Sequence, residues 1–219
     1  MPAQEKKLNK NKKALVIILE LLALAIFLYL IILPFYPAVE YEVKNYVTRD
    51  EKVDWQDKKA VEEKGEELIA KAQEKEEPVI TPNHLIISKI GVSAPIIQTD
   101  NEDYGLHKGA WLLPNTSTPD QSGNTVISAH RFKYLPPSNL TFYLLDKLEV
   151  GDVIFIIWRG ENYFYRVKET KIVPADEMSI LNPTDQPTLT LFTCDPIYST
   201  KNRLVVVSEL IKNDINSNP

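Results

Sequence analysis

The stretch Thr188-Leu-Thr-Leu-Phe-Thr-Cys194, followed by Arg203-Leu-Val-Val-Val207, decides the fold of this chain. Both segments are short, apolar and rich in β-branched residues, which is typical of buried strands. The loop 195–202 joins them. If they pair as an antiparallel hairpin, Cys194 and Arg203 lie at the same end of neighbouring strands, about 5 Å apart in the hydrogen-bonding direction.

The same pattern recurs along the chain after Pro82, where short apolar runs are separated by Gly, Pro and Asn. Turn signals such as Pro119-Asp120 and Gly151-Asp152 divide the runs. This pattern predicts a mainly β fold, a small closed or nearly closed barrel, with one short helix at 140–148. The predicted strands besides the first two are 84–88, 124–128, 153–158 and 163–167.

A different segment lies near the N-terminus. Residues 14–33 form an apolar run whose one charged residue is Glu20, long enough for a transmembrane helix. Five lysines and one glutamate within 1–13 give a charge of +4, whereas 34–77 carries thirteen acids and eight bases. The positive-inside rule therefore predicts a cytoplasmic N-terminus and an extracellular main domain at the cell membrane. A cleaved signal peptide is the alternative, although the run is longer than is usual for one.

We expect five parts: a basic cytoplasmic N-terminus (1–13), a transmembrane anchor (14–33), a charged helical linker (34–77), a barrel domain (78–212) and a polar tail (213–219). In the linker, apolar residues recur at helical offsets, which predicts a solvated stalk or a surface helix. Pro78 and Pro82 end this pattern because proline disfavours helix.

Composition excludes several functions. The net charge is −5 and no basic patch follows the anchor, so nucleic acid is not expected as a partner. The single cysteine permits no intramolecular disulfide and no cluster of thiolates for zinc. Asp100, Glu102 and Asp103 are interpreted as a solvated acidic turn, so we expect no metal and no cofactor.

The residue types around Cys194 suggest acyl-transfer chemistry. A neighbouring Arg203 would stabilise a thiolate and could hold an oxyanion. Such chemistry also needs a proton carrier. The histidines are His84, at the start of the predicted strand 84–88, His107, in a predicted turn, and His130, after strand 124–128. These residues alone leave open that Cys194 is an inert core residue of a non-catalytic, anchored, peptide-binding barrel.

At these positions the sequence resembles the sortase family. Thr190-Leu-Phe-Thr-Cys194 resembles the family's TLxTC signature, and Arg203 follows at the distance of its arginine. Further similar segments are 85–96, 123–131, which ends beside His130, and 142–152. The resemblance implies an eight-stranded sortase barrel within 78–212 in which Cys194, His130 and Arg203 are catalytic.

The resemblance also implies the reaction and the partners. Cys194 would cleave an LPxTG-like sorting signal of a secreted protein, form a thioacyl enzyme, and transfer the protein to an amine on a cell-wall precursor. Transfer to a pilin lysine is the alternative, and Asp54-Trp55 faintly resembles the lid of pilin-building sortases. In sortases the loop before the cysteine strand shapes the substrate groove, so Ile180, Leu181 and Pro183, together with Thr193, are the expected substrate-binding residues.

Overall fold

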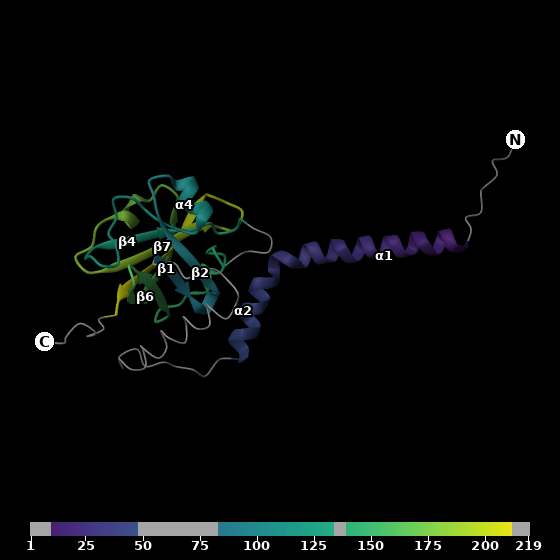
Figure 1. The fold of residues 1–219 in the computed structure, drawn as a ribbon, viewed down its shortest axis with the longest axis horizontal. Helices are drawn as coiled ribbons and strands as arrows, with labels where there is room; N and C mark the ends of the chain where they lie inside the picture. Colours follow the sequence, from purple (N-terminus) through teal and green to yellow (C-terminus); the bar gives the residue numbers. More distant parts are fainter. Residues whose placement is uncertain (1–9, 48–82, 134–138, 212–219) are drawn as a thin grey trace.

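The computed structural model describes residues 10–47, 83–133 and 139–211. Within these ranges eight strands close into a barrel in the order β1-β2-β3-β4-β7-β8-β6-β5 (Figure 1). The mainly β fold and the closed barrel predicted from the sequence are confirmed. The strands are β1 (Asn83–Ile87), β2 (Val92–Gln98), β3 (Ala110–Leu112), β4 (Asn124–Ser128), β5 (Val153–Trp158), β6 (Glu161–Pro174), β7 (Thr188–Asp195) and β8 (Asn202–Leu210).

Strand pairing brings distant segments together at one end of the barrel. β4 and β7 pair in parallel, from Asn124↔Thr188 to Ser128↔Phe192. β7 and β8 pair antiparallel, so the first residue of β8 lies opposite the last residue of β7. The C-terminal ends of β4 and β7 therefore meet the beginning of β8, and we call this end the rim.

Alternating side chains along the strands fill the barrel. On β7, Leu189 and Leu191 are fully buried and belong to the main apolar core, as Leu204 and Val206 of β8 do. Because successive side chains on a strand point to opposite faces, the residues between these belong to the outer face. Cys194 lies at the rim end of that outer face.

The short helices differ from the sequence prediction. α4 (Glu102–Lys108) forms where a turn was expected, and it includes His107. Asn101 caps it by accepting a hydrogen bond from the Tyr104 backbone N–H at 2.9 Å. The helix expected at 140–148 is instead a single turn of 3₁₀ helix, η3 (Leu145–Lys147). Two further 3₁₀ turns are η2 (Ser88–Ile90) and η4 (Met178–Leu181).

Gly105 explains why the sequence of α4 resembles a turn. Glycine disfavours helix, but a Cβ at this position would lie 2.3 Å from the indole ring of Trp111 in β3. The helix can therefore pack closely over β3 only with glycine here. Close packing against a tertiary neighbour outweighs local propensity at this position.

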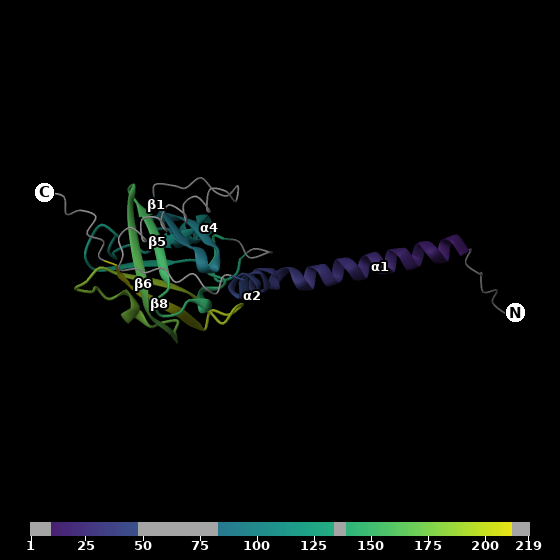
Figure 2. The ribbon, with the colours of Figure 1, turned by 90° about the horizontal axis from the view of Figure 1, so that it is seen from below.

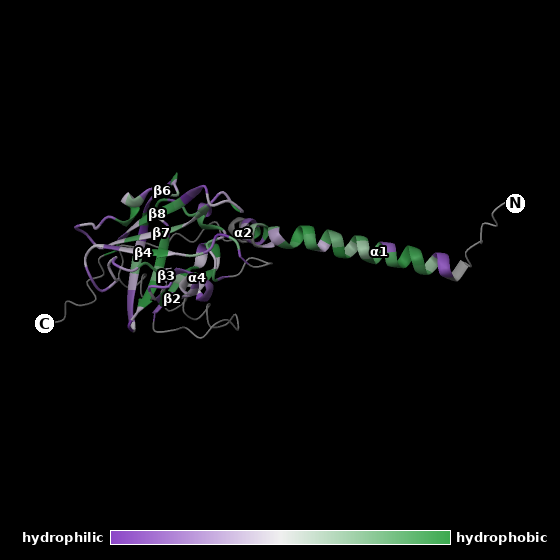
Figure 3. Ribbon diagram, turned by 90° about the horizontal axis from the view of Figure 1, so that it is seen from above, coloured by the Kyte–Doolittle hydropathy of each residue, from purple (hydrophilic) through white to green (hydrophobic). Residues whose placement is uncertain are grey.

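Before the barrel, the chain forms α1 (Lys10–Ile32), the 3₁₀ turn η1 (Leu33–Phe35) and α2 (Tyr36–Val47). The stretch Lys12–Phe35 is long and apolar enough to cross a membrane, and none of its most apolar window is buried. Figure 3 shows hydrophobic residues along most of α1. α1 is thus consistent with the predicted single-pass anchor.

α2 packs against the barrel, whereas α1 projects away from it (Figures 1 and 2). The Tyr41 side chain is 9% exposed and joins the main core. The Tyr143 hydroxyl donates a hydrogen bond to the backbone carbonyl of Pro34 at 3.0 Å. The first part of the predicted linker is thus a surface helix, and its remainder, including Asp54-Trp55, lies outside the described residues.

Candidate active site

Cys194 and Arg203 are directly opposite each other on β7 and β8. Residues paired in this way on antiparallel strands carry their side chains on the same face. Cys194 is a free, half-buried cysteine rather than a fully buried core residue. The hairpin expected from the sequence is therefore present, and it places the thiol at the rim.

His130 approaches the same position from β4. The β4–β7 ladder ends at Ser128↔Phe192, and the Thr193 hydroxyl then donates to the Ala129 carbonyl at 2.8 Å. His130 follows the end of β4 by two residues, and Cys194 lies within β7 two residues after Phe192, so the register sets the two residues at the same end of the barrel. Parallel pairing thus brings together two residues that are far apart in sequence.

The surroundings of His130 disfavour its protonated form. Burial lowers the pKa of His130 most, and the neighbouring positive charges of Lys133 and His107 lower it further. Asp103 at the start of α4 acts in the opposite direction. Lys133 also shares a hydrogen bond of 2.9 Å with Nδ1 of His107. His107 therefore lies within electrostatic reach of His130.

The Arg203 guanidinium is held by the loop that joins β7 to β8. Its Nη1 donates to the backbone carbonyls of Thr200 at 3.0 Å and Asn202 at 3.1 Å. These bonds fix a cation at the rim on the strand beside the thiol. Donors of this kind can stabilise negative charge that develops on a carbonyl oxygen during acyl transfer.

A second arginine, which the sequence analysis did not single out, lies behind the rim. Arg131 is 6% exposed and contacts the carboxylates of Asp146, at 2.8 Å, and Asp195, at 3.3 Å. Its position directly after the candidate catalytic histidine was a signal for its importance. However, a single charged residue after a strand is usually solvated, so only the fold reveals its burial.

The loop before β7 contains the residues expected to bind substrate. The buried Asn124 amide donates to the backbone carbonyls of Ile180 and Asn182 at 3.0 and 3.1 Å, which fastens η4 to the first residue of β4. Ile180 and Leu181 are half-buried and Pro183 is exposed. Their contact with a substrate stays a prediction.

Thr193 has a different environment from these loop residues. Its side chain is 1% exposed, and its hydroxyl is bonded to the Ala129 carbonyl. A buried side chain with this partner joins β4 to β7 and offers no surface to a peptide. We therefore interpret Thr193 as a structural link behind the candidate catalytic residues.

The remaining candidates lie elsewhere. His84 lies within β1, is fully buried, and shares a hydrogen bond of 3.0 Å with the Ser93 hydroxyl. Asp100 precedes α4, and Glu102 and Asp103 form its first turn. In the described part of the chain, no group of three or more His, Cys, Asp or Glu residues is arranged to hold a metal ion.

Comparison with known proteins identifies relatives. Sortase D of Bacillus subtilis is 32% identical over 114 residues, which are 51% of this chain and 53% of that protein. Sortase A of Listeria monocytogenes is 32% identical over 92 residues, covering 42% of this chain and 40% of that protein. The matched part of this chain thus spans about half or less of each relative.

Solved structures agree with these relatives. A sortase D5 transpeptidase of Clostridium perfringens matches with a TM-score of 0.52 and 28% identity, covering 66% of this chain and 88% of that one. A pilus-related sortase C of Group B Streptococcus matches with a TM-score of 0.55 and 32% identity, covering 63% and 71%. The family model for the sortase domain matches residues 85–211. Because this match covers more than half of the length of the chain, the chain belongs to the sortase family.

Proposed function

We propose that this chain is a cysteine transpeptidase that cleaves an LPxTG-like sorting signal and transfers the resulting acyl group to an amine. The observation that supports the proposal is the strand register: Cys194 pairs with Arg203, and His130 follows the end of β4 beside β7 at the same end of the barrel. A thiol, an imidazole and a guanidinium provide the nucleophile, the proton carrier and the oxyanion donor that acyl transfer requires.

In the proposed reaction, the Cys194 thiolate attacks the backbone carbonyl of the threonine in the signal. Arg203 stabilises the oxyanion, and protonated His130 gives its proton to the leaving glycine amine. A thioacyl enzyme remains. An acceptor amine then gives its proton to His130, attacks the thioester and releases Cys194 as a thiolate, which restores the starting state.

The η4 segment supports a position for the signal along β4 and β7. From Asn124, where η4 is fastened, to His130 the strand covers about 20 Å at about 3.3 Å per residue. An extended LPxT segment covers about 10–14 Å. With its threonine at Cys194, the signal's leucine and proline would therefore point towards Ile180, Leu181 and Pro183.

Location follows from the anchor. We infer that α1 spans the cell membrane with the basic residues of 1–13 in the cytoplasm, which places the barrel outside the cell. Secreted proteins that carry sorting signals, and amines of the cell wall, would then be accessible to the rim.

The test uses the full chain in detergent micelles or nanodiscs, with a library of LPxTG-like peptides and an amine. Mass spectrometry should detect the transfer product with the natural sequence and not with Cys194→Ala. An iodoacetamide probe should label Cys194 in the folded protein, and more slowly in His130→Ala. Labelling only after unfolding would instead support a non-catalytic, peptide-binding barrel.

The acceptor distinguishes wall attachment from pilus assembly. The similarity to a pilus-related sortase C favours testing a pilin lysine as the alternative to a cell-wall amine. Competition between a lysine-containing pilin peptide and a cell-wall precursor peptide, at equal concentrations, would assign the acceptor. We expect the cell-wall amine to be preferred, and a preference for the pilin lysine would assign the chain to pilus assembly.

A further inference from the structure

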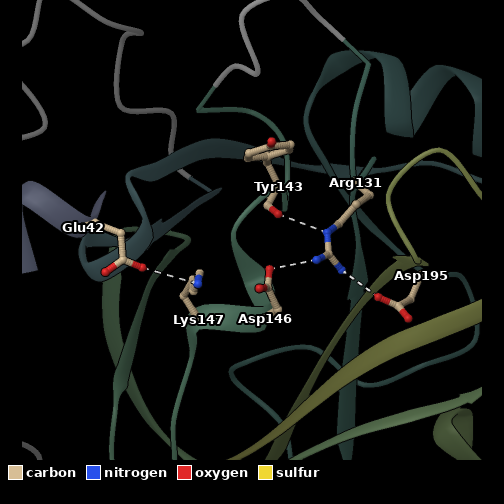
Figure 4. A network of polar contacts seen from close by, with 6 residues as sticks. All are labelled: Glu42, Arg131, Tyr143, Asp146, Lys147 and Asp195. Carbon is tan, nitrogen blue, oxygen red and sulfur yellow. Dashed lines mark hydrogen bonds and ion pairs between the residues drawn. The ribbon is translucent and has the colours of Figure 1, made fainter. Parts of the chain in front are cut away.

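Arg131 is a buried cation with three hydrogen-bond acceptors around it. Its side chain is 6% exposed. Nε donates to the Tyr143 carbonyl at 3.0 Å, Nη2 to Asp146 at 2.8 Å and Nη1 to Asp195 at 3.3 Å (Figure 4). A buried charge is costly unless such partners compensate it, so these contacts hold the guanidinium in one orientation.

The partners of Arg131 adjoin both proposed reacting residues. Arg131 directly follows His130, and Asp195 directly follows Cys194. The contact between Arg131 and Asp195 therefore connects the residue after His130 to the residue after Cys194. The Thr193 hydroxyl and the Ala129 carbonyl make a similar link two residues earlier on both segments.

The segment 142–146 makes hydrogen bonds to both His130 and Arg131. The Phe142 N–H donates to the His130 carbonyl at 2.9 Å, and Tyr143 and Asp146 accept from Arg131. His130 is thus held through its own carbonyl and through the next side chain. Acyl transfer depends on such positioning, because a displacement of about 1 Å can cost about 100-fold in rate.

We propose that Arg131, through Asp195, is a positioning residue that sets the separation of His130 and Cys194. The inference rests on the proposed transpeptidase function. A guanidinium suits this role because its planar fork of donors can bind three acceptors in fixed directions at once. The ammonium group of lysine keeps the charge but not this geometry.

The test compares Arg131→Lys with Arg159→Lys in the full chain in nanodiscs. Arg159 also pairs with an aspartate, Asp120, at 3.0 Å, but it is 65% exposed. It lies between β5 and β6, at the end of the barrel opposite the rim. We expect Arg131→Lys to lower kcat about 10- to 100-fold with KM changed less than about 3-fold, and Arg159→Lys to change neither.

A second variant, Asp195→Ala, covers the case in which Arg131→Lys does not fold. In Asp195→Ala, Arg131 keeps its hydrogen bonds to Asp146 and to the Tyr143 carbonyl. The two substitutions combined should cost no more in kcat than the larger single loss, since both break one link. Additive losses, or a wild-type kcat in both folded single variants, would overturn the proposal.

The NMR resonance of the His130 imidazole gives a readout that needs no substrate. Arg131→Lys and Asp195→Ala should shift or broaden it, and Arg159→Lys should not. If the natural sequence shows no transfer activity, the proposed function fails, and this resonance alone then decides the role of Arg131. An unchanged resonance in both rim variants would show that Arg131 is merely structural.

Discussion

At the residue scale, three titratable side chains influence the pKa of His130, and they give a prediction about pH. Burial lowers the pKa of His130 most, and Lys133 and His107 lower it further, whereas Asp103 raises it. Lys133→Met should therefore raise the pKa of His130 towards its ordinary value. The limb of the activity profile governed by His130 should move to higher pH, because the imidazolium persists to higher pH.

An NMR titration of the His130 imidazole measures this change directly. Lys168→Met is the control, because Lys168 lies on β6 and pairs with Glu209 at 3.2 Å. Lys168→Met should not change the midpoint of the His130 titration. A midpoint for Lys133→Met that stays in place or falls would refute the electrostatic role of Lys133.

His84 makes the stability of the barrel depend on pH. Burial lowers the pKa of His84 from 6.5 to about 4. The unfolded chain therefore binds a proton that the folded chain rejects, and stability falls as pH decreases from about 6.5 to about 4. The full loss is about 3 kcal/mol. In urea unfolding between pH 7.5 and 4.5, His84→Gln should have a flatter dependence on pH, and equal slopes would contradict this account.

At the scale of elements, the junction of β4 and β7 depends on Thr193. Thr193→Val keeps the shape but leaves the Ala129 carbonyl without its donor, which should cost about 1–3 kcal/mol of unfolding free energy. Thr170 is exposed on β6 and its hydroxyl makes only a long contact of 3.5 Å with the Leu148 carbonyl, so Thr170→Val should change stability by less than about 0.5 kcal/mol. Denaturant unfolding compares them, and equal stabilities would show that the bond to Ala129 contributes nothing.

α2 and the barrel form a second junction. Tyr41 belongs to the main core, whereas the Lys147–Glu42 ion pair is 3.5 Å long and more exposed. Tyr41→Ala should therefore destabilise the barrel by about 3 kcal/mol. Glu42→Ala should cost less than about 1 kcal/mol. Thermal unfolding measures both, and a barrel indifferent to Tyr41→Ala would mean that α2 is only loosely attached.

Sequence patterns predicted the strands more reliably than the helices. The predicted strands correspond to β1, β4, β5, β6, β7 and β8, because their apolar runs are buried by the barrel. β3 has only three residues and α4 contains Gly105, so neither carries a local signal. The polar second half of β6 was also missed, because its side chains are largely exposed while its backbone pairs with β8.

The residues of the candidate site also differ in how far the sequence could predict them. Cys194, His130 and Arg203 were recognisable because the residue types and a family motif coincide at the ends of predicted strands. Arg131 and Asp195 were not, because their importance lies in a contact between positions 64 residues apart. Such a contact exists only once β4 and β7 pair in parallel.

At the scale of the whole molecule, the rim lies close to the end of the apolar span. Tyr143 reaches Pro34 with its hydroxyl and accepts from Arg131 with its carbonyl. Figures 1 and 2 show the loop between β7 and β8 on the side of the barrel that faces α1. We expect the full chain to float with liposomes on a density gradient. A fragment beginning at Pro34 should remain in the bottom fractions of the gradient. Flotation of that fragment would show that the barrel itself binds lipid.

The central claim is that the three side chains at the rim act as one acylating unit. Intact mass spectrometry of the full chain, mixed with an LPxTG-like peptide and quenched in acid, tests it most directly. We predict that the mass increases by the acyl part of the peptide on Cys194, that Cys194→Ala shows no increase, and that His130→Ala and Arg203→Ala show almost none. An adduct that forms equally well without His130 and Arg203, or on another residue, would contradict the account.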